Sequence, residues 1–380
     1  METLSATVMD AAGNVLGSTL TIDDGIVIEM SPARDDPGTQ AYFFPGFIDL
    51  HCHGGRGVSF PDSLDGEDID RGAATHARAG TTHLIASLVS TEDPLPSIRV
   101  LADACDRGTL IGIHLEGPYV SRKKAGAQNP DVIRPIDLDD LRQWLEAGRG
   151  WIKTVTIAPE LDNSDRAVEL LHAYGVIVSW GHTNANSEQT RVAIEHANNV
   201  VGRSPGQTTT HLFNAMPGLD HRNPGPVREF LHAAKNNRAV VEIIGDGVHV
   251  ATELVADCLT YLDHPTEPGL ALVTDALACA GMPNGDYVLG GLDVTMTDGV
   301  ATLTGTSTIA GGASTLADQV IRLLEYGVAA DVLARATMLA PARALGIDPP
   351  ASPAHGKPLT GVLISGKTVR AWRDGNELGN

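Results

Sequence analysis

Cysteine is scarce in this chain of 380 residues, which contains four thiols, at Cys52, Cys105, Cys258 and Cys279. No two of them have CxxC spacing, so the sequence predicts neither a disulfide framework nor a structural zinc site held by thiolates. Cys52 lies between two histidines of a predicted strand, so its side chain faces away from theirs, and we interpret it as a packing residue. Neither a signal peptide nor a long apolar run is present, so we expect a cytoplasmic protein without a membrane partner.

Basic residues are also few. The chain has 27 Lys and Arg against 47 Asp and Glu, which gives a formal net charge of −20. Because nucleic-acid binding needs clustered Lys and Arg, this balance argues against a nucleic-acid partner, and the acidic surface mainly aids solubility. No GxGxxG motif opens a helix after the first strand, which disfavours a dinucleotide-binding Rossmann fold.

Short apolar runs typical of buried strands recur eight times, and helix-compatible segments such as 137–148 and 187–199 lie between most of them. Alternation of this kind indicates a parallel sheet covered on both faces. Eight units favour an α/β fold closed into a (β/α)8 TIM-like barrel, which takes about 250 residues. The runs are FFPGFIDLH, TTHLIASLV, LIGIHLE, WIKTVTIAP, GVIVSWGHT, TTTHLFNA, AVVEIIGDG and LALVTDA.

Both ends of the chain alternate polar and apolar residues like strands. Residues 5–30 read as a hairpin around a DDG turn, and GVLIS and TVRAW bracket Gly366 and Lys367. Neither end could bury much apolar surface alone. We therefore predict a small β-sandwich domain built from residues 1–44 and 350–380, and a catalytic barrel domain over 45–349.

A further hairpin is expected after the eighth strand, at residues 286–305, with turns at Gly291 and Asp298-Gly299. Inserted at the rim of a barrel, it could shape a substrate pocket. It could equally be a decoration that faces solvent.

Six residues of metal-ligand type each follow an apolar run and precede a turn, where barrel strands carry chemistry. They are His51 and His53 in PGFIDLHCHG, Glu116 in IGIHLEGPY, His182 in VSWGHTNAN, His211 in THLFNAM and Asp275 in LVTDALA. A His-x-His pair on a strand places both imidazoles on one face, although the motif alone is weak. A lone histidine at a strand end is more often structural, but several at matching positions favour ligands.

Glu116 would be costly to bury unpaired, so it is either a metal ligand or the partner of Lys123 or Lys124. Histidine and carboxylate ligands without cysteine suit catalytic Zn²⁺ with a position open to water, and Mn²⁺ or Fe²⁺ could take the same ligands. Two groups can be drawn, one of Glu116, His182 and His211, the other of His51, His53, Glu116 and Asp275. Asp275 is the candidate general base, with a helix N-cap as the alternative.

The motifs PGFIDLHCHG, HLEGPY, GHTNA, THLFNAM, DGVHV and LVTDA resemble the metal-dependent amidohydrolase superfamily and, within it, the N-acetylglucosamine-6-phosphate deacetylases, from about residue 44 to 345. Many superfamily members bridge two metals with a carbamylated lysine on the fourth strand. Lys153 lies at the wrong end of that strand, so the resemblance implies that Glu116 is the bridge. It also implies hydrolysis of a phosphorylated N-acetyl amino sugar to the amine and acetate, with Asp275 as base and then acid. Both histidines of HxH are present, which predicts capacity for a second ion.

The resemblance further implies residues that bind the sugar phosphate. These are Asn214, Ala215 through its backbone, Arg222 and His249, with some contacts from a neighbouring subunit and hence a homodimer. A solvated charge and a core histidine are the alternatives for Arg222 and His249.

Three departures from the family pattern bear on the sugar. Gln128 stands where relatives often have a histidine that contacts the sugar, and Gln can donate a hydrogen bond but carries no charge. Ile309 begins a stretch that is usually Leu-Ala-Gly-Ser, and it can still line an acetyl pocket. An Ala-Asp-Leu-Val strand near the C-terminus is absent. N-acetylgalactosamine 6-phosphate and unphosphorylated N-acyl compounds therefore stay open as substrates, as do, more remotely, a deaminase and a non-catalytic scaffold.

Overall fold

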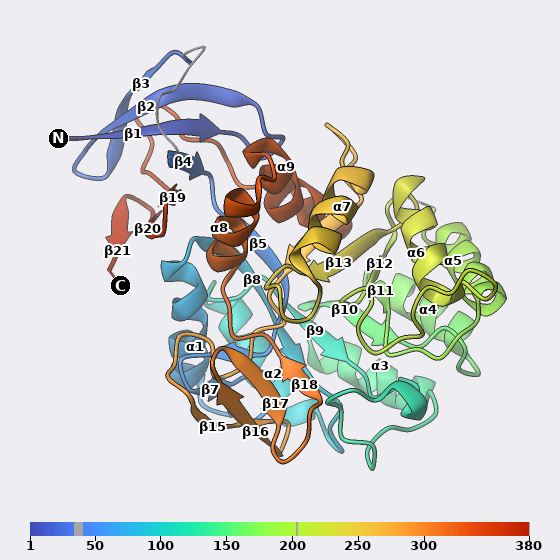
Figure 1. Ribbon diagram of the computed structural model, residues 1–380. Helices are drawn as coiled ribbons and strands as arrows, with labels where there is room; N and C mark the ends of the chain where they lie inside the picture. Colours follow the sequence, from blue (N-terminus) through green and yellow to red (C-terminus); the bar gives the residue numbers. More distant parts are fainter. Residues whose placement is uncertain (34–40, 203, 380) are drawn as a thin grey trace.

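The computed structural model describes residues 1–33, 41–202 and 204–379, and its centre is a parallel barrel (Figure 1). Within the described residues the barrel has eight strands, which follow one another around it in sequence order. They coincide with the eight apolar runs, so the predicted (β/α)8 fold is confirmed. The strands are β5 (Phe47–Cys52), β8 (Thr81–Leu88), β9 (Gly112–Glu116), β10 (Ile152–Ile157), β11 (Ile177–Trp180), β12 (Gln207–Thr209), β13 (Val240–Ile244) and β14 (Leu270–Val273).

The barrel closes where its last strand meets its first. The Asp275 N–H donates to the carbonyl of His51 at 2.8 Å, and the His53 N–H donates to the carbonyl of Ala276 at 2.7 Å. Below this pair of bonds, the Thr274 hydroxyl donates to Asp49 Oδ2 at 2.6 Å. The seam therefore lies directly beside three of the predicted metal ligands.

Helices surround the barrel, and some of them begin with a side-chain cap. The Asn186 side chain accepts from the Gln189 N–H in a capping box, and Thr315 and Asp318 form another. The segments 137–148 and 187–199 are helical over most of their length, as predicted. The helices are α1 (Gly66–Arg78), α2 (Leu95–Asp106), α3 (Leu138–Ala147), α4 (Ser164–Ala173), α5 (Ser187–Val201), α6 (Gly225–Lys235), α7 (Thr252–Leu262), α8 (Leu316–Tyr326), α9 (Ala330–Ala334) and α10 (Ala340–Leu345), with a 3₁₀ turn η1 (Arg122–Lys124) and a π turn η2 (Arg335–Leu339).

The two chain ends build one sheet, as Figure 1 shows at the blue and red ends of the colour bar. In the described residues it has seven strands in the order β21-β20-β19-β4-β1-β2-β3. Strands β19 and β4 join the two ends of the chain. The predicted Asp-Gly turn is present between β2 and β3, with positive φ at Asp24 (48°) and Gly25 (74°). The strands are β1 (Glu2–Met9), β2 (Val15–Asp23), β3 (Ile26–Ser31), β4 (Ala41–Phe44), β19 (Gly361–Ser365), β20 (Thr368–Arg373) and β21 (Asn376–Leu378).

This terminal sheet curls, so that the predicted sandwich is a single continuous sheet whose outer parts approach each other. The Leu359 N–H donates to Gly25 O, and the Gly375 N–H donates to Leu359 O, both at 2.9 Å. Phe43 and Trp372 lie in the apolar cluster of this sheet. Residues 34–40 and 380 of the predicted terminal segments lie outside the described part, and the domain limits stay a prediction.

The inserted strands after β14 form a small antiparallel sheet, with the predicted turns. Its strands are β15 (Gly285–Leu289), β16 (Leu292–Thr297), β17 (Val300–Leu303) and β18 (Ile309–Gly311). A separate pair of short strands, β6 (Gly54–Gly55) and β7 (Val58–Ser59), follows β5 in the sequence. Leu289, Val294 and Met296 pack on Leu277 and Cys279, which follow β14. The insertion is thus anchored at the end of the barrel that carries Asp275.

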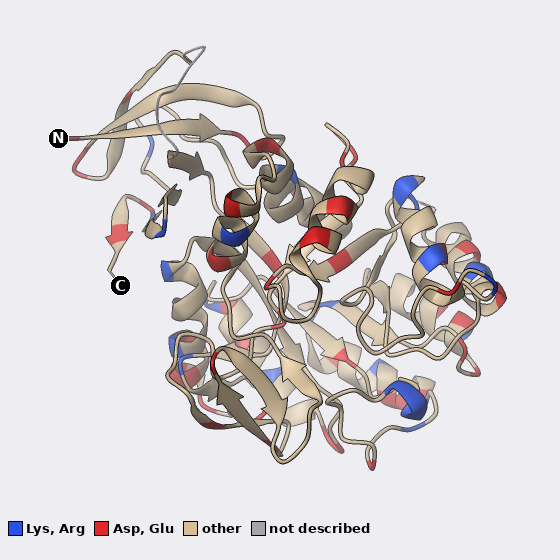
Figure 2. Cartoon of the chain, viewed as in Figure 1, with Lys and Arg blue, Asp and Glu red and all other residues tan. Residues whose placement is uncertain are grey.

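Charge is spread over the molecule. In Figure 2, acidic positions occur on helices around the barrel and on the terminal strands, with basic positions interspersed. Within the described ranges, no helix combines the length and apolar character needed to cross a membrane.

Candidate metal centre

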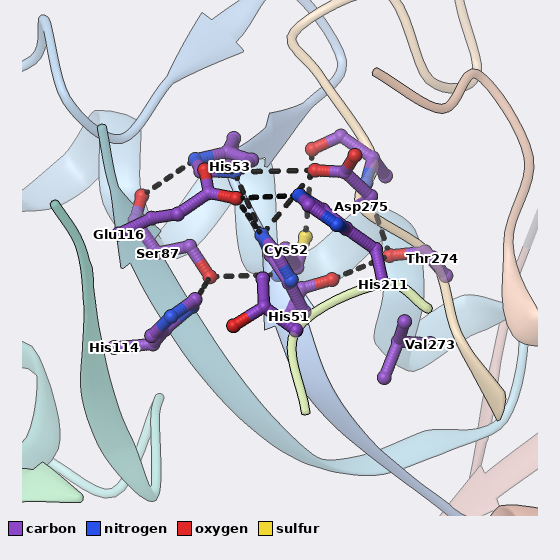
Figure 3. A network of polar contacts seen from close by, with 12 residues as sticks. His51, Cys52, His53, Ser87, His114, Glu116, His211, Val273, Thr274 and Asp275 are labelled. Carbon is purple, nitrogen blue, oxygen red and sulfur yellow. Dashed lines mark hydrogen bonds and ion pairs between the residues drawn. The ribbon is translucent and has the colours of Figure 1, made fainter. Parts of the chain in front are cut away.

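The six predicted ligands converge at the carboxyl ends of the barrel strands. Figure 3 shows His51, His53, Glu116, His211 and Asp275 around one point. Three ligands lie two residues beyond their strands in left-handed conformation, with φ of 46° at His182, 27° at His211 and 49° at Asp275. Backbone strain of this kind in non-glycine residues concentrates at functional sites. The chain at these positions is bent so that the side chains face the centre.

One half of the cluster is formed around one oxygen of Glu116. Its Oε1 lies 3.1 Å from His182 Nε2 and 2.9 Å from His211 Nε2, and the two Nε2 atoms are 3.1 Å apart. No ion pair joins Glu116 to Lys123 or Lys124 in the described structure, and Lys124 Nζ donates instead to the Met216 carbonyl. The alternative of a lysine partner for Glu116 is therefore wrong.

The other half uses the second oxygen of Glu116. His53 Nε2 lies 3.2 Å from Glu116 Oε2 and 3.2 Å from Asp275 Oδ1. His51 Nε2 lies 3.0 Å from His53 Nε2 and 3.4 Å from Asp275 Oδ1. His51 Nε2 also lies 3.6 Å from Glu116 Oε1, so Glu116 lies between the two halves and contacts histidines of both. Lys153 Nζ donates to the Gly150 carbonyl, far from a bridging position.

The donor set fits a metal. The Nδ1 atoms of His53 and His182 face the carbonyls of Ser87 (3.1 Å) and Lys124 (2.9 Å), which fixes their hydrogens on Nδ1 and turns Nε2 toward the cluster. Neutral Nε2 lone pairs separated by 3.0 to 3.1 Å would repel one another. A proton or a metal ion between the two atoms of each pair would relieve this repulsion. Since the ligands are nitrogen and carboxylate oxygen without sulfur, divalent transition metals of catalytic sites suit them.

The electrostatics point the same way. Burial alone would lower the pKa of His51, but the carboxylates of Glu116 and Asp275 raise it well above its ordinary value. Burial would likewise raise the pKa of Glu116, yet His51 and the hydrogen bonds from His182 and His211 hold it well below its usual range. Asp275 is held ionised by His51 and His53 in the same way, with its pKa lowered despite burial. Metal ions entering the site would displace the histidine protons.

A pocket of about 280 Å³ opens on the cluster. The inserted sheet contributes to it, which favours the pocket-shaping interpretation of the insertion. The pocket is lined by His53, Glu116, His182, His211 and Asp275 of the cluster, by Gln128, Asn214, Ala215, His249 and Ile309 among the predicted substrate residues, and by Val89, Gly126, Ala127, Leu289, Ser307, Thr308 and Ala310.

The side chains of the predicted substrate residues have different hydrogen-bond partners within the chain. Asn214 Nδ2 donates to the carbonyls of His211 (3.3 Å) and Leu212 (3.4 Å). His249 Nδ1 lies 2.8 Å from Asp246 Oδ2. Burial alone would lower the pKa of His249, but this hydrogen bond and the charge of Asp246 raise it, which favours the protonated imidazole beside the pocket.

Gln128 is engaged at both ends of its amide. Its Nε2 donates to Glu116 Oε2 at 2.8 Å, and its Oε1 accepts the Ser90 N–H at 2.6 Å. The side chain is buried. Gln128 therefore contacts Glu116 and also lines the pocket.

Arg222 does not join the pocket of its own chain. It lines a separate surface depression together with Arg191 and Arg228. Its neighbourhood is an exposed loop between β12 and α6, and only its backbone N–H has a partner within the described residues, Asp220 Oδ1 at 2.9 Å.

Several contributing residues were not found from the sequence. Glu242 lies 3.3 Å from His51 Nδ1, and Asp246 pairs with His249. A signal for Glu242 was present, because it is a carboxylate within the apolar stretch AVVEII, as Glu116 is in its own run. Ser87 contributes a backbone carbonyl, which leaves no trace in the sequence.

The fold and the cluster together define a metal-dependent amidohydrolase. The Amidohydrolase family model matches residues 42–358, and the chain belongs to that family. It is 32% identical over 341 residues to the N-acetylgalactosamine-6-phosphate deacetylase of Escherichia coli O157:H7 (87% of this chain and 85% of the relative), and 33% identical over 290 residues to the N-acetylglucosamine-6-phosphate deacetylase of Lysinibacillus sphaericus (75% and 71%). It also resembles, with a TM-score of 0.84 and 33% identity over 98% of this chain and 99% of the other, a mutant of the N-acetyl-D-glucosamine-6-phosphate deacetylase from Mycobacterium smegmatis in complex with N-acetyl-D-glucosamine 6-phosphate.

Proposed function

We propose that this protein hydrolyses N-acetyl-D-glucosamine 6-phosphate to D-glucosamine 6-phosphate and acetate, as a cytoplasmic enzyme of amino-sugar catabolism. The observation that carries the proposal is that Glu116 and Asp275 both lie 3.2 Å from His53 Nε2, in a pocket that His249 also lines. The likeness to the Mycobacterium smegmatis complex supports the same substrate.

The chain provides the ligands for one or two divalent ions, for which Zn²⁺ is our first choice and Mn²⁺ or Fe²⁺ are alternatives. Glu116, His182 and His211 would hold the first ion, and His51 and His53 the second, with Glu116 as the bridge and Asp275 as a further ligand. Bound there, the metal would supply Lewis acidity to the amide carbonyl and to the attacking water.

Asp275 performs the proton transfers. As an ionised carboxylate it accepts a proton from the attacking water, while the water oxygen bonds to the carbonyl carbon. It then donates that proton to the amide nitrogen as the carbon–nitrogen bond breaks, which yields the free amine and acetate. His53, 3.2 Å from Asp275 Oδ1, holds the carboxylate toward the pocket.

Phosphate recognition requires hydrogen-bond donors and positive charge, and positive charge is scarce in a chain of net charge −20. We assign phosphate binding to His249, to Asn214 and to the backbone at Ala215. Arg222 lies outside the pocket of its own subunit, which supports a homodimer in which a neighbouring subunit supplies this residue near the phosphate.

N-acetyl-D-galactosamine 6-phosphate is the second candidate substrate. The similarity to the Escherichia coli O157:H7 enzyme favours it. Gln128, at a position where the family resemblance implies a histidine in many relatives, leaves the choice of sugar open. The two sugars differ in the configuration of one hydroxyl, and the pocket residues named above do not distinguish them by charge.

Acetate release tests the proposal. Purified protein loaded with Zn²⁺ is assayed with both phosphorylated sugars and with unphosphorylated N-acetylglucosamine. We expect the highest kcat/KM on N-acetylglucosamine 6-phosphate and a large loss without the phosphate. Release of ammonia, or equal turnover of the unphosphorylated sugar, would contradict the proposal.

A further inference from the structure

Glu242 is a buried carboxylate inside the barrel that the reaction above does not use. It lies on β13, in an apolar run, and is 2% exposed. In the described structure its side chain has one polar partner, His51 Nδ1, at 3.3 Å from Oε2. Burying a carboxylate costs free energy unless it is hydrogen-bonded or paired with an opposite charge. In this structure, the contact with His51 provides that compensation.

The contact fixes the ring of His51. With its Nδ1 hydrogen donated to Glu242, the Nε2 atom is directed at His53 and Asp275, where a metal ligand is needed. The other ligand histidines are held differently. His53 and His182 donate to neutral backbone carbonyls, and His211 Nδ1 has no partner among the described residues. His51 is therefore the one ligand histidine described here with a carboxylate behind it.

Counting charge explains why that carboxylate lies on this side of the cluster. Glu116 and Asp275 supply two negative charges, which one divalent ion beside Glu116, His182 and His211 would balance. Glu242 adds a third negative charge behind His51, at the half formed by His51 and His53. A second divalent ion, with a water-derived ligand, would offset it.

Resting on the proposed metal-dependent function, we infer that Glu242 is a positioning residue that orients His51 and sets the affinity of the His51–His53 half for a second divalent ion. It acts through His51 and does not touch the substrate. Glu242 carboxylate, His51 imidazole and metal would form a carboxylate–histidine–metal triad, in which loss of the carboxylate typically costs about 10- to 100-fold in metal affinity.

The test counts metal and needs no substrate. Wild-type protein and the variants Glu242→Ala and Glu242→Gln are loaded with Zn²⁺ and equilibrated with chelator at graded free Zn²⁺, and bound metal per chain is measured by mass spectrometry. We expect two ions in the wild type. In Glu242→Ala the second should be lost at about 10- to 100-fold higher free Zn²⁺ while the first is unchanged. Glu242→Gln, which keeps an acceptor for His51 but no charge, should fall between them.

Glu229→Gln is the matched control, because Glu229 is also a buried carboxylate but pairs with Arg191 and Arg228 on the outer helices. It should bind both ions like the wild type. In the Co²⁺-loaded proteins, the visible absorption that grows with the second equivalent should change in the Glu242 variants alone.

The inference is overturned if the wild type saturates at one ion, or if Glu242→Ala binds the second ion as the wild type does. Equal weakening of both ions would also refute it, since that indicates general loss of structure. If Glu242→Ala does not fold, an unchanged second affinity in Glu242→Gln refutes the charge argument. A protein that binds two ions, and loses affinity for the second alone in Glu242→Ala, but releases no acetate would instead contradict the proposed function.

Discussion

Replacing Gln128 with leucine separates two roles for this residue, holding the bridging carboxylate and contacting the sugar. The substitution roughly conserves volume and removes both hydrogen bonds of the amide. A hydrogen bond to the charged Glu116 is worth about 1.5–3 kcal/mol, and leaving the buried Ser90 N–H unpaired costs about 1–3 kcal/mol. We therefore expect the free energy of unfolding to fall by about 2.5–6 kcal/mol.

Gln319→Leu provides the comparison. Gln319 is equally buried and also joins two strands, accepting from the Gly245 N–H and donating to the Val273 carbonyl, both at 3.0 Å, but it contacts no carboxylate. Chemical denaturation should show similar losses of stability in the two variants. Metal retention and kcat should fall in Gln128→Leu alone, because only there does Glu116 lose a donor.

The opposite pattern would refute this reasoning. If Gln128→Leu retains its metal and kcat, and KM for the amino sugar rises, then Gln128 contacts the sugar, as the sequence predicts, and does not position the bridge. Gln128→His, which restores the residue type usual in relatives, should in that case restore sugar affinity.

Three other outcomes are expected. Asp275→Asn should keep the first metal ion and lower kcat by about 10²- to 10⁴-fold, measured by acetate release beside metal analysis; near-normal turnover would remove Asp275 as the base. In the metal-free protein, the raised pKa of His249 stabilises the fold fully at pH values below the pKa of an unfolded histidine, and this stabilisation is lost as the pH rises through the pKa of His249 in the folded state. The lowered pKa of Asp246 has the opposite dependence, because its stabilisation is lost as the pH falls through the pKa of Asp246 in the folded state. Urea unfolding of His249→Asn should therefore be less pH-dependent than the wild type above about pH 6.5, and an identical profile would contradict this. Arg222→Ala mixed with Asp275→Asn should recover activity through hybrid dimers, detected on mixing after partial denaturation; no recovery would argue against phosphate contacts across subunits.

The barrel and most residues of the polar cluster could be predicted because they obey local rules. Buried parallel strands are continuous apolar runs, and His51, Glu116 and Asp275 interrupt such runs at their ends. An ionisable group buried there costs free energy unless it has a partner, so these residues stand out. The inserted sheet and the Asp24-Gly25 turn follow from equally local turn chemistry.

What the sequence could not predict depends on distant segments. Gln128 meets the Ser90 N–H across 38 residues, and His51 meets Glu242 across 191, so neither contact has a signature in its neighbourhood. The curling of the terminal sheet depends on Leu359 reaching Gly25. The position of Arg222 outside its own pocket reflects the path of a loop, which residue type alone does not determine.

The seam between the first and last strands of the barrel affects when the site can assemble during synthesis and folding. Asp275 and His53 belong to opposite ends of the barrel sequence and are brought together by the backbone bonds that join the last strand to the first. During synthesis, the chain can present His53 and Glu116 long before residue 275 emerges, yet the Asp275 carboxylate joins them only when the ring closes. With Asp275 as the proposed base, chains that are truncated before it, or that stall with the barrel open, should not hydrolyse an amide, so activity would report that the whole ring has folded.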